Sequence, residues 1–226
     1  MKLVTWNCCR GDYLKKREML VQLSPDIAVI QEARRTQTWP LEDHWFGPNP
    51  NNGLSLLTPK GPPAAPLPIS NDAPWSIVPF RIEGALPFNL LAVWTRQETG
   101  YLKGLAQALD SYSDFLRERP SVVMGDFNAS ALWDKPRAKV DFSRIAQRLA
   151  DEFGLHSAYH QHYDEPFGAE SRPTHYFRWN ESHPFHIDYC FVPATWTIES
   201  VSVETGPIWA KASDHRPLVV TVLPSA

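Results

Sequence analysis

Cysteine is scarce in this sequence. The 226 residues include only three cysteines, Cys8, Cys9 and Cys190. The adjacent Cys8 and Cys9 make poor disulfide partners, and no pair of Cys or His residues has the spacing of a zinc site. A chain of this length can bury enough apolar surface to fold without a disulfide or a structural metal. We therefore predict reduced, buried thiols, as in a cytoplasmic protein.

Long apolar runs are also missing. No stretch approaches the ~20 apolar residues that span a membrane, and the apolar run within residues 1–7 is too short for a signal peptide. The sequence shows no internal repeat, and its one biased tract is the proline- and alanine-rich segment 59–74. Because strong strand patterns flank that segment, we interpret it as a surface excursion rather than a linker. We therefore predict a single domain over residues 1–226, monomeric and without a membrane partner.

The sequence also has no excess of basic residues. The formal net charge is −3, with 22 Lys and Arg against 25 Asp and Glu, whereas proteins that bind many phosphates usually carry surplus Lys and Arg. If the protein acts on nucleic acid, it must therefore use metal ions or a local basic rim. Any single basic residue in a loop is most simply a solvated surface charge. Five such residues could nevertheless form a basic rim: Arg34, Arg35, Arg137, Lys139 and Arg172.

Apolar periodicity predicts about ten strands and three helices. Strands are expected at residues 2–8, 26–31, 53–58, 75–82, 86–95, 122–124, 155–159, 174–179, 185–192, 198–204 and 218–222. Helices are expected at residues 13–23, 101–117 and 141–153, and loops at 34–52, 128–140 and 161–172. The first strand, helix and second strand form a βαβ-type unit, and residues 83–85 predict a hairpin. This mixture favours two facing sheets with helices outside over one doubly wound sheet.

The stretch from Val122 to Asn128, VVMGDFN, takes an apolar strand into polar side chains. A strand that breaks at Gly125 would present Asp126 and Asn128 on the same side at its carboxyl end. In an α/β protein that edge of the sheet is where ligands bind. An ordinary exit from a strand into a turn is the alternative, because Gly, Asp and Asn are turn residues. Four other segments of the same design favour the ligand-binding interpretation.

Polar residues end or interrupt five apolar strands. They are Asn7, Glu32, Asp126 with Asn128, Asp188 in mid-strand, and Asp214 with His215. Buried carboxylates are costly unless paired or bound to a cation, and Asp and Glu without thiolates suit Mg²⁺ or Mn²⁺. A neighbouring His and Asp suit proton transfer. Together these groups are suited to phosphoryl transfer to water.

Some of these residue types have ordinary structural roles as well. Asp188 could be a strand carboxylate that bonds to a turn, and we interpret His186 beside it as a rim or structural residue. We interpret five further histidines as loop residues, although the last two could line the cleft: His156, His160, His162, His175 and His183. Tryptophans are more often core or loop anchors than platforms for a base, and we interpret Trp39, Trp45, Trp133 and Trp209 in this way.

Five motifs taken together resemble a known family. They are Thr5-Trp6-Asn7, Ile30-Gln31-Glu32, Gly125-Asp126-Phe127-Asn128, Ile187-Asp188-Tyr189 and Ser213-Asp214-His215. In this order they resemble the motifs of the endonuclease/exonuclease/phosphatase superfamily, which includes exonuclease III-type abasic-site endonucleases and pancreatic-type deoxyribonucleases. The resemblance spans nearly the whole chain. It implies a four-layer α/β sandwich of two mixed sheets flanked by helices, which agrees with the strand pattern.

The resemblance implies a metal site at three of these positions. Glu32 would be the principal Mg²⁺ ligand, with Mn²⁺ as the alternative ion. Asn7 would lie beside Glu32, and Asp214 would be a further carboxylate of the metal site.

The resemblance also implies catalytic roles for four residues. Asp126 would position or deprotonate the attacking water, and Asn128 would hold the phosphate. His215, paired with Asp188, would transfer a proton or bind the phosphate. Whether Asp126 or His215 is the base stays open.

The sequence departs from the family pattern at two positions. The first motif of the family often has an acid two residues after the Asn, where this chain has Cys9, so we expect no metal ligand there. A His or Tyr often ends a middle strand and contacts the phosphate, and that position corresponds to Trp94. Its indole N–H can donate a hydrogen bond but cannot carry a proton. Tyr101 is a candidate substitute, so Trp94 and Tyr101 are both predicted to bind substrate.

These observations favour a Mg²⁺-dependent phosphodiesterase that acts on nucleic acid, with DNA endonuclease as the preferred reaction. The alternative is the same chemistry on a small or lipid-linked phosphoester, which the acidic balance favours. A non-catalytic binding module is disfavoured because no member of the acid, amide and histidine set is missing. Fold alone does not decide the substrate.

Overall fold

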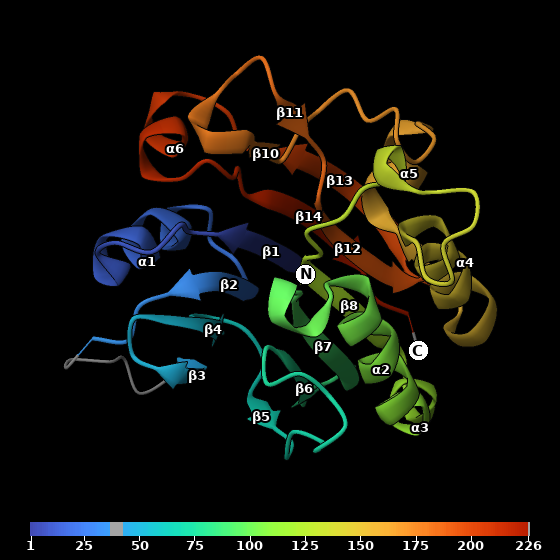
Figure 1. Cartoon of the computed structure of the whole chain (residues 1–226). Helices are drawn as coiled ribbons and strands as arrows, with labels where there is room; N and C mark the ends of the chain where they lie inside the picture. The colour runs from blue at the N-terminus through green and yellow to red at the C-terminus, as the bar shows by residue number, and fades with distance from the viewer. Residues whose placement is uncertain (37–42, 226) are drawn as a thin grey trace.

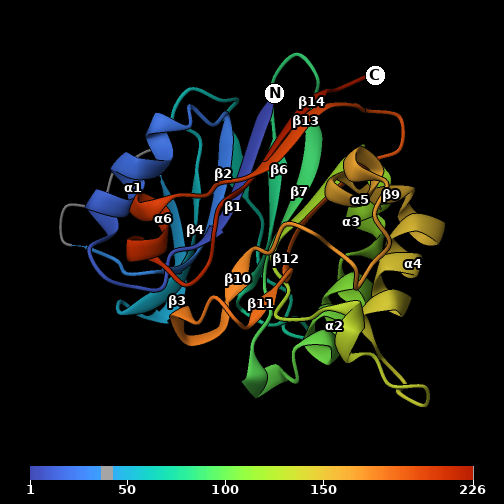
Figure 2. The same cartoon turned by 90° about the horizontal axis from the view of Figure 1, so that it is seen from above.

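Two six-stranded β-sheets face each other in the computed structural model, and helices cover their outer sides (Figure 1). The structure describes residues 1–36 and 43–225. Seen from above, helices α1 and α6 lie on one side of the paired sheets and α2, α3 and α4 on the other (Figure 2). This arrangement confirms the predicted four-layer α/β sandwich.

The first sheet contains both ends of the described chain. Its strand order is β13 (Thr197–Val203), β14 (Leu218–Leu223), β1 (Lys2–Asn7), β2 (Ile27–Ala33), β4 (Asn52–Leu57) and β3 (His44–Asn49). Strands β1 and β2 are parallel neighbours, which α1 (Tyr13–Gln22) connects in sequence. The βαβ-type unit is therefore confirmed. The outer face of this sheet packs on α1 and on α6 (Pro207–Ala212).

The second sheet repeats this design with its own parallel pair. Its strand order is β5 (Ala64–Pro66), β6 (Ile77–Ile82), β7 (Phe88–Trp94), β8 (Ser121–Asp126), β12 (Asp188–Pro193) and β9 (Leu155–Ser157). Helices α2 (Leu102–Ser111) and α3 (Ser113–Glu118) connect the parallel strands β7 and β8. Together with α4 (Phe142–Phe153), they cover the outer face. A short helix, α5 (Ala158–Tyr163), follows β9.

Alternation along the strands divides the buried side chains among three apolar layers. In β8, Val122 and Met124 belong to the core between the sheets, whereas Val123 belongs to the core under the helices. In β1, Leu3 faces the core between the sheets and Val4 faces α1 and α6. Because successive side chains point to opposite faces, a strand buried on both sides must be apolar throughout. This is why the central strands are mostly apolar before their ends, with buried exceptions such as Thr5 in β1.

The predicted break at Gly125 is wrong, because β8 continues through Gly125 to Asp126. Gly125 has φ 151°, and a β-carbon there would lie 1.8 Å from the carbonyl oxygen of Val93 on the parallel neighbour β7. Only glycine allows the two backbones to approach so closely. Gly125 therefore brings Asp126 to the end of the strand rather than ending the strand early.

Several predicted boundaries also differ from the structure. The helix at 101–117 is two helices, because Tyr112 leaves helical geometry (φ −109°, ψ 17°) and its hydroxyl accepts a hydrogen bond from the Ser70 N–H (3.0 Å). Strands β3 and β5 lie where loops were predicted, and residues 37–42 of the predicted loop 34–52 are outside the described ranges. Helix α6 was not predicted, and α5 takes the place of the end of the predicted strand 155–159.

The region from 174 to 192 also departs from its two predicted strands. It forms a short hairpin of β10 (His175–Tyr176) and β11 (Pro184–Phe185), and then β12. A turn of 3-10 helix, Phe177–Trp179, lies between the hairpin strands. Such short outlying strands are defined by pairing with distant backbone, which local periodicity does not encode. No helix in the described ranges is both long and apolar enough to cross a membrane.

Candidate active site

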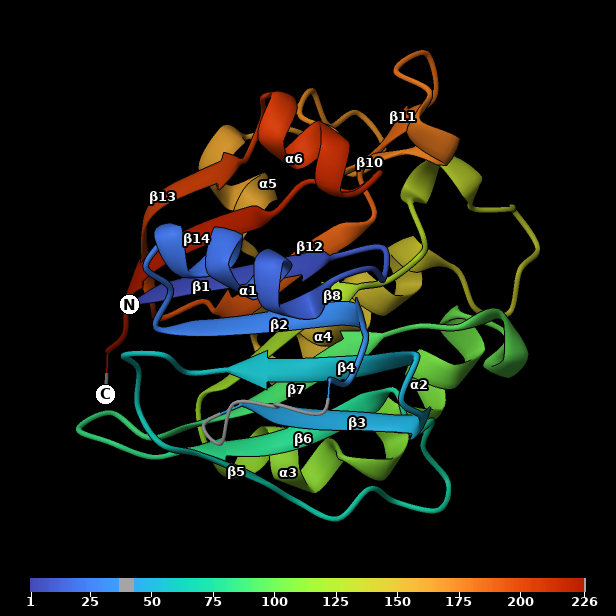
Figure 3. The same ribbon diagram turned by 90° about the vertical axis from the view of Figure 1, so that its left-hand side faces the viewer.

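All five polar motifs meet at one edge of the sandwich. Parallel strands β1 and β2 deliver Asn7 and Glu32 to it, and β8 delivers Asp126. Strand β12 begins there with Asp188, and His215 lies there just before β14. Figure 1 looks onto this edge, which lies to the right in Figure 3. The β10–β11 hairpin borders the site, because His175 pairs with His215 in an isolated bridge.

Asp126 is at the centre of the hydrogen-bond network. One carboxylate oxygen accepts the backbone N–H of Asn128 (2.8 Å), and the other accepts the side-chain amides of Asn7 (2.9 Å) and Asn128 (2.9 Å). Asn128 has a left-handed backbone conformation, φ 46°. The two side chains meet as predicted, but this turn after the end of β8 brings them together rather than alternation along an extended strand.

Asp188 lies directly opposite Asp126, since the two residues are Cα partners in the antiparallel pairing of β8 with β12. Two like charges in facing positions of a sheet are unfavourable. Burial, and then the charge of Asp188, raise the pKa of Asp126 to about 7. Asp126 can therefore take up or release a proton near neutral pH.

Asp188 was predicted in mid-strand, but it is the first residue of β12. The strand starts late because the Thr174 hydroxyl accepts the backbone N–H groups of both Ile187 and Asp188 (3.1 Å each). Its carboxylate accepts a hydrogen bond from His215 Nδ1 at 2.9 Å. The other carboxylate oxygen is buried and has no hydrogen-bond partner among the described residues.

His215 is almost completely buried among carboxylates. Burial alone would lower its pKa, but the charges of Asp188, Asp126 and Asp214 outweigh burial and raise the pKa to about 9. The ring is therefore an imidazolium at neutral pH, with Nδ1–H donated to Asp188. No described residue is hydrogen-bonded to Nε2, so this nitrogen is available to a substrate oxygen.

Glu32 is displayed by an irregularity in β2. The register of β2 against β4 shifts between Ile30 and Ala33, and Glu32 has φ 55°. The bulge turns the carboxylate toward the site, where it accepts from the Asn7 amide (3.4 Å) and from Arg10 Nε (3.2 Å). Its side chain is 23% exposed, so it remains accessible at the mouth of the site.

Asp214 adds a second carboxylate on this side. Its Oδ2 lies 3.7 Å from His175 Nε2. Burial favours the neutral acid, but His175 and His215 outweigh burial and lower the pKa of Asp214, which keeps it ionised. Burial, and then the charges of Asp214 and Glu32, raise the pKa of the Cys9 thiol to about 11. Cys9 therefore places a neutral thiol, not an acid, beside the two carboxylates.

These residues fit a divalent metal ion. Two groups of three side chains, His175–Asp214–His215 and Asp126–Asp188–His215, have nitrogen or carboxylate oxygen atoms within 4.8 Å of one another. Because a protonated His215 has no lone pair to offer, the carboxylates are the main donors available to a cation in these groups. The orphaned oxygen of Asp188 and the concentration of carboxylates both favour a bound cation. Glu32 belongs to neither group, and its nearest neighbours in the site are the Asn7 amide and Arg10.

The two predicted substrate-binding aromatics differ in accessibility. Trp94 is 4% exposed, packs edge-on against Trp75 and lies under the Arg96 guanidinium, 4.4 Å from the ring centroid. Tyr101 is 37% exposed. Burial, and then the charge of Asp126, raise the pKa of Tyr101, so its hydroxyl stays protonated. Both rings line an open polar depression of about 180 Å³.

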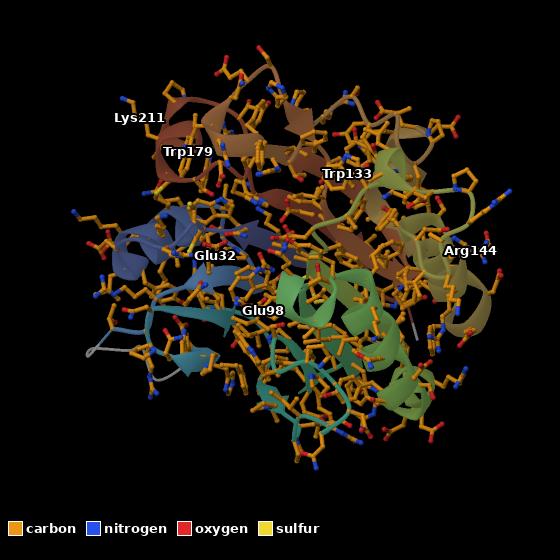
Figure 4. The ribbon with its side chains drawn as sticks, viewed as in Figure 1. Glu32, Glu98, Trp133, Arg144, Trp179 and Lys211 are labelled. Atoms are coloured by element: carbon orange, nitrogen blue, oxygen red, sulfur yellow. The ribbon has the colours of Figure 1, made fainter. Side chains whose placement is uncertain are left out.

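That depression connects the metal side of the site with the phosphate side. Its remaining lining residues are Arg10, Glu32, Asn52, Thr95, Arg96, Gln97, Glu98 and Asn128. Figure 4 shows Glu32 and Glu98 on the site face, with Trp133 and Trp179 toward the hairpin side.

Two positioning residues escaped the sequence reasoning. Thr174 fixes the start of β12 from 14 residues upstream, so no local pattern identifies it. The Ser213 hydroxyl donates to the Asn7 carbonyl (2.7 Å) and accepts the His215 backbone N–H (2.9 Å). Ser213 joins β1 to the histidine, and its place in the Ser-Asp-His motif was the available signal.

Comparisons with known proteins agree with this geometry. A family model described as Endonuclease/Exonuclease/phosphatase family matches residues 4–215. No curated protein matches the sequence. A solved 3'-5' exonuclease (NExo) from Neisseria meningitidis is similar at 18% identity and TM-score 0.71, covering 98% of this chain and 99% of that chain.

Two further solved structures have similar folds. One is a 3' phosphatase NExo from Neisseria bound to a product DNA hairpin, at 18% identity and TM-score 0.69, covering 98% of each chain. The other is the endonuclease domain of TRAS1, a telomere-specific non-LTR retrotransposon, at 17% identity and TM-score 0.67, covering 100% of this chain and 99% of that chain. At these identities the likeness shows the shared fold.

Proposed function

Because the chain belongs to the Endonuclease/Exonuclease/phosphatase family, we propose that it is a metal-dependent phosphodiesterase that cleaves nucleic acid, with DNA endonuclease as the preferred reaction. The observation that carries this proposal is the arrangement of Asp126, Asp188 and His215. Two carboxylates face each other, one with a pKa near neutrality, and a protonated histidine lies against them. An acid and a base are thus present together at neutral pH, as hydrolysis requires.

The metal site of this proposal consists of Glu32 and Asp214, with Asn7 beside them. Mg²⁺ is the preferred ion, with Mn²⁺ as the alternative, because the donor set is dominated by carboxylate oxygens. When bound, such an ion neutralises charge on the phosphate and polarises its oxygen. Asn7 orients both sides of the site, since its amide bonds to Glu32 and to Asp126.

Proton transfer falls to Asp126 and His215. Asp126, held by the two Asn amides, accepts a proton from the attacking water, because a pKa of about 7 matches that task. His215 presents Nε2–H to a phosphate oxygen and stabilises the charge that develops there. Asp188 keeps the imidazolium oriented, and Asn128 holds the phosphate. The sequence left the choice between Asp126 and His215 open, and this proposal takes Asp126 as the base.

Two observations favour a nucleic-acid substrate. The similar structures named above are an exonuclease, an endonuclease domain and a phosphatase with a DNA product. Arg137 and Lys139, two of the five predicted rim cations, form no ion pair within the described ranges. Arg172, by contrast, is held by Glu165 at 3.2 Å. Unpaired cations in the loop that follows β8 support the proposal of a basic rim, despite the net charge of −3.

A second candidate is hydrolysis of a small or lipid-linked phosphoester by the same groups. The acidic balance of the chain favours it, since binding of a small phosphoester needs fewer cations than binding of a long phosphate backbone. Activity on nucleic acid should fall steeply with salt, whereas activity on a small substrate should not.

The test is incubation of the purified chain with supercoiled plasmid, with Mg²⁺ or with EDTA, alongside His215→Ala. Nicking and linearisation that need both the metal and His215 are the expected result. A folded protein that leaves plasmid intact with either Mg²⁺ or Mn²⁺, yet hydrolyses a panel of small phosphoesters, would contradict the nuclease assignment. The single domain, the monomeric state and the cytoplasmic location remain predictions.

A further inference from the structure

A second pocket opens beside Asn128, on the far side of Tyr101 from Glu32. It has a volume of about 290 Å³ and lies between the start of α2 and the loop that follows β8. Tyr101 and Asn128 line both this pocket and the depression at the metal side. A substrate whose phosphate is held at Asn128 would therefore have a neighbouring group in reach of this pocket.

Two aromatic side chains and an apolar floor line the pocket. Tyr101 is 37% exposed and Trp133 is 45% exposed, so their rings remain available for contact. Leu102, Ala129 and Ala138 provide much of the apolar surface between them. A planar, partly apolar group suits such a pocket, because stacking on aromatic rings is favourable for every base. Its size is at the lower end of the range for ligand pockets, which suits one nucleoside.

The pocket wall that contains Trp133 is held in place before any ligand binds. The Trp133 ring packs against Phe185 of the hairpin, with centroids 4.9 Å apart. Ser130 caps the short 3-10 turn, and the Asp134 carboxylate accepts the backbone N–H groups of Phe142 (2.8 Å) and Ser143 (2.9 Å) at the start of α4. A preformed wall avoids much of the ordering cost of binding.

One cation, Lys135, and two carboxylates, Asp134 and Asp141, line the pocket. Backbone N–H groups at the start of α4 engage both carboxylates, whereas the cations of this loop have no such partner within the described ranges. Lys135, Arg137 and Lys139 follow Trp133 in the same loop, are all exposed, and have no acidic partner among the described residues. The arginines of the nearby helices, by contrast, form ion pairs. Arg117 pairs with Glu152 (3.3 Å), and Arg148 pairs with Asp110 (2.7 Å). Unpaired cations beside an aromatic pocket are the combination that binds single-stranded nucleic acid.

We propose that this pocket binds one unpaired nucleobase, that of a nucleotide adjacent to the scissile phosphate, between Tyr101 and Trp133. The proposal rests on the proposed function and narrows its substrate class to strands that are single or locally unpaired. A base that is stacked and paired within a duplex must first leave the helix before it can lie between two side-chain rings. Trp133 is therefore a specificity residue rather than a loop anchor alone.

The test measures the coupling between Trp133 and the base. Single-stranded DNA oligonucleotides are compared with copies that carry a tetrahydrofuran abasic analogue at either nucleotide next to the cleaved bond. In the wild-type chain, removal of one of these bases should raise KM about tenfold, within the range of one base–aromatic stack. Trp133→Ala should raise KM by a similar factor on the normal strand and leave the abasic strand unchanged, whereas Trp133→Phe should keep most of the effect.

The matched control is Trp179→Ala. Trp179 is 52% exposed and lies on the hairpin, outside the pocket, so this variant should keep the wild-type dependence on the base. An equal loss on normal and abasic strands in Trp133→Ala, or no loss on either, would overturn the proposal.

A binding measurement separates this proposal from the proposed function. Fluorescence anisotropy of the same labelled strands is followed with His215→Ala, with and without the added Trp133→Ala change, so that no turnover is needed. If binding depends on both Trp133 and the base but the wild-type chain does not hydrolyse the strand, the base pocket is supported and the nuclease assignment is contradicted. If the wild-type chain hydrolyses the strand but neither assay shows a joint dependence on Trp133 and the base, the nuclease assignment is supported and the base pocket is contradicted.

Discussion

Two buried histidine–carboxylate pairs in this protein have nearly the same geometry. His215 Nδ1 lies 2.9 Å from Asp188, and His160 Nε2 lies 3.1 Å from Glu170. All four side chains are less than 10% exposed. Distance and burial alone do not distinguish one pair from the other.

The two pairs differ in what surrounds them. His160 uses both ring nitrogens, because Nδ1 also bonds to the Ser157 hydroxyl at 2.7 Å, and Glu170 further accepts the backbone N–H of Gly168. His215 keeps Nε2 unbonded and shares its surroundings with Asp126 and Asp214 as well as Asp188. The His160–Glu170 pair therefore has all its hydrogen bonds within the protein. The His215–Asp188 pair is surrounded by further carboxylates and keeps a free N–H donor.

This difference separates a structural pair from a reactive one. A satisfied pair stabilises the loop that it closes, here residues 164–170 against α5. A pair among surplus carboxylates has a perturbed pKa and the capacity to bind something else. In this protein, the free second nitrogen of His215 and the surplus carboxylates around it make it the functional candidate of the two.

The largest expected effect comes from removing each histidine in turn. His215→Ala should lower kcat by about 10²–10⁴, the usual contribution of a proton-transferring group, because it removes the donor to the phosphate. His160→Ala should leave kcat within about twofold. It should instead lower the free energy of unfolding by about 1–3 kcal/mol, since Ser157 and Glu170 lose a buried partner.

Plasmid cleavage rates and thermal unfolding of both variants distinguish these effects. For a chain of this length, a loss of 1–3 kcal/mol corresponds to a fall in Tm of about 2–12 °C. A His160→Ala protein that is folded but inactive would erase the distinction between the pairs.

The next effect concerns the metal. Glu32→Gln keeps the shape of the side chain but removes its charge, so we expect the Mg²⁺ concentration for half-maximal activity to rise at least about 100-fold, the upper end of the effect of residues that only support a ligand. Glu170→Gln is the matched control and should leave this concentration unchanged. Activity measured across a Mg²⁺ titration after EDTA treatment decides the point, and equal behaviour of the two variants would remove Glu32 from the metal site.

The dependence of activity on pH should reflect the two titrating groups of the site, Asp126 and His215, which have different pKa values. Asp126 acts as a base only when deprotonated, so activity should rise as the pH increases through about 7. His215 acts as a donor only when protonated, so activity should fall as the pH increases through about 9. Each limb should approach about tenfold per pH unit, with a maximum between the two values. These apparent values belong to the coupled set.

The matched variant for that profile is His160→Ala, which should keep both limbs. A profile that stays flat from pH 6 to 8 in the wild-type chain, measured at saturating metal, would contradict Asp126 as the base.

The smallest expected effect is that of Arg10→Ala. Arg10 is 64% exposed and bonds to Glu32 at the mouth of the site, and exposed ion pairs contribute little. Its positive charge opposes a cation at Glu32, so its removal should tighten apparent Mg²⁺ binding by about two- to fivefold. Weaker Mg²⁺ binding in the same titration would mean that Arg10 supports the site rather than competing with the ion.

Local sequence identified the candidate site residues. Apolar runs that end in Asn7, Glu32 and Asp126 indicate buried strands whose carboxyl ends carry polar groups, and the pattern of strands and helices predicted two sheets and the first βαβ unit. Alternation and helical spacing depend on which faces are buried, and burial is recorded directly in residue type. The motif order then indicated the family.

Only the tertiary structure decided how those residues act on one another. Asp126 and Asp188 are 62 positions apart in sequence but face each other across β8 and β12, and this contact is a main cause of the raised pKa of Asp126. The packing of Trp133 on Phe185, the late start of β12 at Asp188, and the free nitrogen of His215 also depend on distant partners. Residue type encodes a preference for burial, whereas pairing partners and electrostatic coupling depend on distances that exist only after the chain has folded.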